Sequence, residues 1–522
     1  MSRISRVASL AGVTVSAVIG LAACAPPSGG GNSSDSATIL LPQGFTSLDP
    51  ALASEAYSRV VQAFLYDKLI GLDGTTGGAV SNVASSWNIT PTKAHFVIKD
   101  GITCSDGAPF TAATVVRNLE RMKDPKTAAP LTAQFLGSYD YTVALGADKK
   151  SVDIDFPSPV AFLQQKLADG PGLVCDSGLD DPSKLNTKSA GTGPYVLTKA
   201  TTGDTYVMSR RDGYTWGING ASTSNAIPKT VTIRFVANED TMANLMSSGQ
   251  GDIALLGGAA GKRAKAVGDP SVLAWTLPTT ALFFNHRPGY ITADTAVRRA
   301  LSQLLSPKSF AAVTDPVGGT GATSITGANA VCSAAGKLAD SLPTGGVTAA
   351  ATTLTADGWS KGPDGVWQKG GKRLSVHVIN DDIAAAGMEY IRSTWAGAGI
   401  DVSIDPRSGS AATNALFDNS RWDVSLIGFG ASLPRPSLFS GTLPPRGTNF
   451  SAITNAGYNK AVEEGAVAPG SDCAPWIEGE KALMRSADVL PLMIGTTEFI
   501  SPDYKLGKLS GIYLVPTSLT KR

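Results

Sequence analysis

The residues able to do chemistry are few, and their spacing matches no catalytic motif. The chain of 522 residues has three histidines and contains no G-x-S-x-G, H-E-x-x-H or G-x-x-x-x-G-K-[ST] segment. The paired acids Asp153/Asp155 and Asp381/Asp382 lie in strand-like or loop-like stretches, where carboxylates are usually solvated. We therefore expect no enzyme activity, no metal site and no cofactor.

The first 23 residues have the pattern of a signal peptide. Arg3 and Arg6 precede an apolar stretch over residues 7–19, which is too short for an ordinary membrane span. Leu21-Ala-Ala-Cys24 then resembles the lipobox of bacterial lipoproteins, in which the cysteine is lipidated; the alternative is an ordinary secretory peptide. Residues 24–36 are rich in Gly, Ser and Pro and predict a flexible tether. We expect an exported chain, held by its lipid on the outer face of the cytoplasmic membrane.

The composition excludes several classes of protein. The chain has 44 Lys and Arg against 43 Asp and Glu, which argues against a nucleic-acid partner, since such partners need clustered basic surface. Apolar residues make up 43%, so the chain is not disordered. Its length is sufficient for about two to four domains. We expect a monomeric globular protein.

Four further cysteines, Cys104, Cys175, Cys332 and Cys473, would lie in an oxidising compartment. An even count there predicts two disulfides, and four cysteines allow three pairings. The alternative is four buried thiols. The sequence has no C-x-x-C, which makes a redox motif or a zinc knuckle a poor fit.

Strand and helix patterns alternate along the chain and predict α/β lobes. We expect strands over residues 37–41, 231–236, 374–379 and 423–428, strands joined by a turn within 96–102, helices from Thr111 to Pro125, over 297–304 and over 388–395, and a surface excursion over 318–346.

Short motifs in a fixed order connect these elements to a known family. They are Ser47-Leu-Asp-Pro50, Leu65-Tyr-Asp-Lys-Leu-Ile70, Ala84-Ser-Ser-Trp87, residues 96–111, Gly191-Thr-Gly-Pro-Tyr195, residues 211–217, Phe284-Asn285, residues 296–301, 356–359, 365–367 and 371–374. In this order the sequence resembles the extracytoplasmic solute-binding proteins, family 5, of peptide, dipeptide and nickel ABC importers. The resemblance covers nearly the whole chain from residue 37.

The resemblance implies a two-lobe, periplasmic-binding-protein-like α/β fold (type II, cluster C), with a ligand cleft between the lobes. Lobe I would comprise residues 37–68, 190–278 and 495–522, an extra subdomain 69–189, and lobe II 282–490. Hinge crossings are expected near 278–285 and 490–496. Cys104–Cys175 and Cys332–Cys473 would then each lie within one lobe and leave the hinge free, so we predict these pairings.

The binding residues are expected in three segments. They are Gln43, Gly44 and Phe45 after the first strand, Phe283, Asn285 and His286 beside the hinge, and Phe429, Gly430, Ser432 and Arg435 after the strand 423–428. Two or more of the aromatic residues could instead belong to the core, and His286 could be structural. Arg435 suits a carboxylate or carbonyl-rich group, or else lies in solvent.

Peptide binders of the family commonly hold the α-ammonium with an aspartate, whose place falls at Ser432. An arginine for the peptide carboxylate is also missing from residues 377–380. The main hypothesis is therefore an importer binding protein for a peptide that is held unlike a simple dipeptide, with ABC permease and ATPase subunits as partners. Alternatives are a binder of haem, a metal chelate or a glycoside, and a lipid-anchored enzyme on the same scaffold.

Overall fold

The structure is a computed structural model of the chain. It describes residues 35–522, except 46, 54, 74–77, 138–139, 275–278, 328–330, 335, 382–384, 408–409, 419, 430–433, 445–446, 469–471, 496, 508 and 512. The expected signal peptide, Cys24 and nearly all of the tether lie outside the described residues, and so do Gly430 and Ser432.

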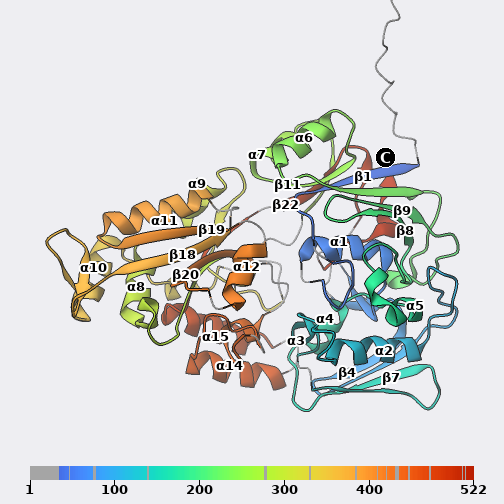
Figure 1. Cartoon of the computed structure of the whole chain (residues 1–522), viewed down its shortest axis with the longest axis horizontal. Coiled ribbons are helices and arrows are strands. Elements are labelled where there is room, and N and C mark those ends of the chain that lie inside the picture. Colours follow the sequence, from blue (N-terminus) through green and yellow to red (C-terminus); the bar gives the residue numbers. More distant parts are fainter. Residues whose placement is uncertain are drawn as a thin grey trace, which may run out of the picture.

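Two α/β lobes lie side by side, as the sequence predicts (Figure 1). The first lobe and its subdomain, blue to green, occupy the right of the view, and the second lobe, yellow to orange, occupies the left. Each lobe is built on its own mixed sheet.

The first lobe contains a seven-stranded sheet in the order β12-β22-β11-β1-β10-β9-β8. Its strands are β12 (Ser271–Ala274), β22 (Thr497–Ser501), β11 (Ile253–Gly257), β1 (Ser36–Leu41), β10 (Thr230–Phe235), β9 (Thr205–Arg210) and β8 (Tyr195–Thr201). β1 is central and pairs in parallel with β10 and β11. Its helices are α1 (Ala56–Leu65), α6 (Glu239–Ser247) and α7 (Gly258–Lys265).

The extra subdomain contains a four-stranded sheet in the order β4-β5-β7-β6 and four helices. The elements are β4 (Ala84–Thr90), β5 (Lys93–Ile98), β7 (Ser151–Asp155), β6 (Thr142–Leu145), α2 (Ala112–Lys123), α3 (Thr132–Leu136), α4 (Leu163–Ala168) and α5 (Asp176–Asp180). α2 begins after Thr111, whose hydroxyl accepts from the Thr114 amide, as predicted. One apolar core runs through the subdomain and the first lobe, so the subdomain is not independent.

The second lobe contains a six-stranded sheet in the order β14-β21-β13-β20-β18-β19. Its strands are β14 (Thr320–Gly321), β21 (Val489–Ile494), β13 (Thr279–Phe284), β20 (Val424–Phe429), β18 (Ser375–Asp381) and β19 (Asp401–Arg407). The helices are α8 (Thr295–Gln303), α9 (Pro307–Thr314), α10 (Gly346–Ala356), α11 (Ala385–Gly397), α12 (Ser410–Phe417), α13 (Pro436–Phe439), α14 (Ala456–Val467) and α15 (Ala474–Arg485). β13 is buried along its whole length because a separate core covers each face.

Smaller strand pairs complete the structure. They are β2 (Ile70–Leu72) with β3 (Ala79–Ser81), β15 (Ser360–Lys361), β16 (Trp367–Lys369) and β17 (Lys372–Arg373) in one sheet, β23 (Tyr504–Lys505) with β26 (Thr520–Lys521), and β24 (Leu509–Ser510) with β25 (Tyr513–Leu514). Both predicted disulfides are confirmed, with Cα atoms of the paired cysteines 6.1 Å apart in Cys104–Cys175 and 4.9 Å apart in Cys332–Cys473.

Two local predictions are wrong. The turn at Asp100-Gly101 follows β5, but no second strand of the sheet comes after it; only an isolated bridge joins Thr103 to Pro109. The stretch 318–346 is no surface excursion, because Ala334 and Leu338 are fully buried. The Gly- and Ser-rich sequence gives no sign of this burial. The buried carboxylate of Glu480 in α15 fixes the stretch by accepting hydrogen bonds from the Ile325 amide and the Thr326 hydroxyl.

Candidate functional site

The chain passes twice between the two sheets. It leaves the first sheet after Ala274 and enters the second at Thr279, and it returns between Ile494 and Thr497. Two such crossings are the arrangement that lets one lobe rotate against the other. A ligand that favours closure must touch both lobes, so we look for its site where residues of the two lobes lie close together away from these crossings.

The first contact between the lobes is apolar. Phe162, beside α4 of the subdomain, packs on Trp476 of α15, with ring centroids 5.1 Å apart. Cys332 of the second disulfide completes the same buried cluster. Phe162 has a φ of +55°, a left-handed conformation that is uncommon for a phenylalanine.

A charged group of residues also brings the two lobes together, and we call it the interlobe cluster: Arg59, Lys68, Asp169 and Tyr513 on one side, and Arg435 of the second lobe, whose guanidinium feels the charges of Asp169 and Arg59. Arg59 of α1 donates from Nη2 to the backbone oxygen of Asp169 at 2.7 Å and to its Oδ1 at 3.0 Å. The hydroxyl of Tyr513 donates to the same Oδ1 at 3.1 Å. The side chains of Arg59 and Asp169 are only 11% and 17% exposed, so this pair is largely removed from solvent.

Lys68 lies in the same cluster. Its Nζ is 3.9 Å from Asp169 Oδ1 and 3.9 Å from the centre of the Tyr513 ring. Its side chain is 16% exposed. Burial lowers the pKa of Lys68 to about 7, with Asp169 opposing and Arg59 adding to the shift.

Arg435 brings a third cation to the cluster from the other lobe. It precedes α13, in the loop after β20. Burial lowers its pKa to about 10, and the charges of Asp169 and Arg59 act on it in opposite directions. No hydrogen bond or ion pair of its guanidinium occurs among the described residues. A residue predicted from the sequence to contact the ligand is thus near two residues that sequence reasoning missed.

The predicted segment after β1 faces mainly its own lobe. Phe45 is buried, stacks on Tyr206 with ring centroids 5.0 Å apart and meets Phe235 edge-on. Gln43 and Gly44 are half-buried, and a side chain at Gly44 would press on the backbone of Gly203. Phe45 is therefore a core residue in this conformation, as the alternative interpretation expected.

Phe283 and Asn285 are likewise internal to the second lobe. Phe283 is fully buried, with its ring centroid 5.9 Å from that of Phe439 and 5.1 Å from that of Phe450. Asn285 is 1% exposed and donates from Nδ2 to the backbone oxygen of Trp422. Neither presents surface to a ligand in this conformation.

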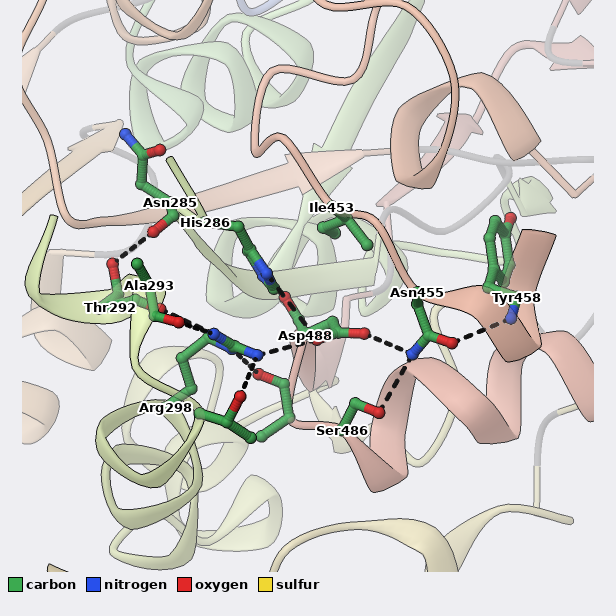
Figure 2. A network of polar contacts seen from close by, with 12 residues as sticks. Asn285, His286, Thr292, Ala293, Arg298, Ile453, Asn455, Tyr458, Ser486 and Asp488 are labelled. Atoms are coloured by element: carbon green, nitrogen blue, oxygen red, sulfur yellow. Dashed lines mark hydrogen bonds and ion pairs between the residues drawn. The ribbon is translucent and has the colours of Figure 1, made fainter. Parts of the chain in front are cut away.

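His286 belongs to a polar network inside the second lobe (Figure 2), which we call the lobe II network. Its Nε2 lies 3.4 Å from the backbone oxygen of Asp488 and its Nδ1 lies 3.9 Å from Asp488 Oδ1. Burial, aided by the charge of Arg298, lowers the pKa of His286 to about 3. A neutral, enclosed imidazole fits the structural role that the sequence left open.

The loop after β20 is only partly described. Phe429 ends β20 and pairs with Thr279, but its side chain, like Gly430 and Ser432, lies outside the described part. Their contact with a solute stays a prediction.

Three family motifs meet at one buried carboxylate. Asp67 of the Leu65–Ile70 motif accepts from Thr192 at 3.0 Å, from the Tyr214 hydroxyl at 2.8 Å and from the Trp216 indole at 3.1 Å. Burial raises the pKa of Asp67, and these donors oppose the shift. Asp67 of this motif therefore has a structural role, whereas the next residue, Lys68, belongs to the interlobe cluster.

Other candidate sites are weaker. A cavity of about 250 Å³ lies between α7 and the loop at Val317, but two of its charged groups, Lys265 and Glu498, already pair with each other at 2.5 Å. Within the described ranges, no group of three or more His, Cys, Asp or Glu residues is placed to hold a metal ion. In the same ranges no helix is long and apolar enough to cross a membrane.

Two α/β lobes, two crossings and buried charges between the lobes define a bilobal binding protein. The chain belongs to the bacterial extracellular solute-binding proteins, family 5, whose middle-region model matches residues 78–449. Among curated proteins it is similar to the glutathione-binding protein GsiB of Shigella boydii serotype 4, with 27% identity over 227 residues. That match covers 41% of this chain and 41% of the relative, so the chain spans less than half the relative's length.

Solved structures share the fold over nearly the whole chain. A substrate binding protein from Microbacterium hydrocarbonoxydans, complexed with 4-hydroxybenzoate hydrazide, has a TM-score of 0.78 at 23% identity. NikZ from Campylobacter jejuni, in complex with Ni(L-His), has a TM-score of 0.78 at 18% identity. Each comparison covers 94% of this chain and 100% of the other.

Proposed function

We propose that this protein is the solute-binding component of an ABC importer, that it encloses a short peptide between its lobes, and that it delivers the peptide to membrane permease and ATPase subunits. The observation that carries the proposal is the interlobe cluster, in which Arg435 of one lobe adds its charge to Arg59, Lys68 and Asp169 of the other. A solute binding there contacts both lobes and favours the closed arrangement.

The similarity to a glutathione-binding protein supports a peptide as the solute, since glutathione is a tripeptide. Native mass spectrometry of protein purified without denaturation tests the proposal. We expect a copurified peptide that is released on unfolding. A haem, a metal chelate or a glycoside in its place would contradict the peptide assignment and leave the binding role standing, whereas turnover of the bound molecule would contradict the binding role itself.

We further propose that Cys24 carries a lipid that anchors the chain at the outer face of the membrane. The Leu21-Ala-Ala-Cys24 segment supports this, because it follows a positive and then an apolar stretch. Cys24→Ala should move the protein from the membrane fraction to the soluble fraction, and Cys24→Ala protein that stays with salt-washed membranes would contradict the anchor.

A further inference from the structure

We propose that Lys68, Arg59 and Arg435 form a binding site for a carboxylate of the solute. The inference deepens the proposed function and rests on it, because it names the chemical class that the site between the lobes selects. It requires an anionic group that approaches from the interface and contacts Lys68 and Arg435 together.

The charge count of the interlobe cluster is the first argument. Arg59 and Arg435 are guanidiniums, and Lys68, with a pKa of about 7, adds about half a positive charge at neutral pH, whereas the cluster has one carboxylate, that of Asp169. Each of these groups is mostly buried, and burying an unbalanced charge is costly unless a counter-charge is supplied. An anionic solute supplies it.

The use of donors in the interlobe cluster is the second argument. Arg59 already donates to Asp169, and Oδ1 of Asp169 also accepts from Tyr513, so this oxygen has little capacity left for Lys68. Lys68 Nζ stands 3.9 Å away, beyond hydrogen-bond distance, and no hydrogen bond to it occurs in the described part of the chain. Lys68 and Arg435 thus keep free donors, which is what a carboxylate needs.

The position of the groups is the third argument. Arg59 lies in the first half of α1, Lys68 comes shortly after the end of that helix, and Asp169 directly follows α4, so all three are fixed by the first lobe and its subdomain. Arg435 comes from the second lobe. A carboxylate between them joins the lobes electrostatically, whereas an empty cluster sets like charges against each other across the interface.

A panel of probes measured by isothermal titration calorimetry tests the site. The panel holds glutathione, glutathione diethyl ester, tripeptide pools with free or amidated C-termini, succinate and citrate. The proteins are wild type, Lys68→Met, Arg435→Met and the control Lys99→Met. Lys99, which follows β5 of the subdomain, is a half-buried lysine that donates to the Trp216 carbonyl and lies outside the cluster.

We expect at least one carboxylate probe to bind wild type. Its affinity should fall about 10- to 100-fold in Lys68→Met and in Arg435→Met, which is the range for the loss of one hydrogen bond to a charged group. In the control Lys99→Met the affinity should fall by less than about threefold. The esterified or amidated counterpart should bind wild type weakly and be insensitive to both cluster variants.

The remaining outcomes separate the two claims. If amidated peptides bind as tightly as free acids, the peptide proposal stands and the carboxylate site is refuted. If succinate or citrate binds through the cluster but no peptide does, the site stands and the peptide proposal fails. If no carboxylate probe binds, or if binding ignores both cluster variants, the site is refuted.

Discussion

Two buried groups of charged residues in this protein differ in their balance of charge. In the lobe II network, Arg298 and Asp488 form a pair of one positive and one negative charge, 5% exposed on each side. In the interlobe cluster, two guanidiniums and the partly protonated amine of Lys68 are balanced by one carboxylate alone. A balanced pair fixes a fold, whereas an unbalanced group is stabilised by a partner from outside. The balance of charge therefore separates a buried site that stabilises the fold from a buried site that favours an anionic ligand.

The lobe II network also satisfies its own donors. Arg298 donates to the backbone oxygens of Thr292, Ala293 and Ala487, to the Thr295 hydroxyl and to Asp488. Asn455 donates to the other carboxylate oxygen of Asp488 at 2.7 Å. Figure 2 shows Asp488, in the segment before β21, contacted by Arg298 of α8, by Asn455 at the start of α14 and by His286. No donor of Arg298 is left for a solute.

The largest expected effect comes from breaking the balanced pair. Asp488→Ala should lower the free energy of unfolding by about 3–5 kcal/mol, because it leaves the buried guanidinium of Arg298 without its counter-charge. Urea unfolding followed by circular dichroism measures this. Asp405→Ala, at a surface pair with Arg407, is the control and should cost about 1 kcal/mol or less. A loss below 1 kcal/mol for Asp488→Ala would show that the buried Arg298–Asp488 pair stabilises the fold no more than the Asp405–Arg407 pair, which would contradict the account.

The next effect concerns pH. His286 is neutral in the folded state, where its pKa is about 3, but the unfolded chain protonates near 6.5. The unfolded state therefore binds more protons between these values, and stability falls as pH drops from about 6.5 toward 3, with a slope approaching about 1.4 kcal/mol per pH unit.

Unfolding free energies at several pH values measure the slope. His286→Asn should flatten it, because the variant has no imidazole at this position to protonate on unfolding. An unchanged slope in His286→Asn would show that the lobe II network accepts an extra positive charge, which would contradict its assignment as a balanced, purely structural network.

A smaller effect separates the apolar contact between the lobes from the charged one. Phe162→Ala removes the ring that packs on Trp476, and burial of a phenylalanine is worth roughly 1.5–3 kcal/mol. Because the contact joins the lobes, we expect part of this as a loss of affinity, about 10-fold, for every solute alike. Phe162→Leu should recover most of it. A loss confined to carboxylate solutes would mean that the two contacts are not independent.

Elements with strong local patterns were predictable from the sequence. Thr111 capping α2, the buried face of α8 and the strand at β20 follow from residue types within a few positions of each other. The disulfide pairing followed from the lobes that the resemblance implied. The burial within 318–346 has no local sign, because the carboxylate that binds Ile325 and Thr326 belongs to Glu480, which is 155 and 154 residues away in sequence.

The interlobe cluster could not be predicted as a whole. Apart from Arg59 and Lys68, the residues of the cluster, which also has Asp169, Arg435 and Tyr513, are far apart in sequence, and each alone looks like a surface residue or a motif position. Arg435 was predicted because it follows a strand end in a proline-rich loop. The aromatic residues Phe45 and Phe283 carried no local sign of whether they face a ligand or a core, and the structure places both in cores.

The most direct test of the unbalanced cluster is the proton that Lys68 must take up. With a pKa of about 7, Lys68 is about half protonated at pH 7, and a bound carboxylate raises its pKa. Asp169 and Arg59 are the charged groups that act on Lys68, and the guanidinium of Arg59 stays protonated at this pH. Calorimetry of the tightest-binding carboxylate probe in two buffers of different ionisation enthalpy should show uptake of about half a proton in wild type and none in Lys68→Met. Equal binding enthalpies in both buffers for wild type would contradict the account.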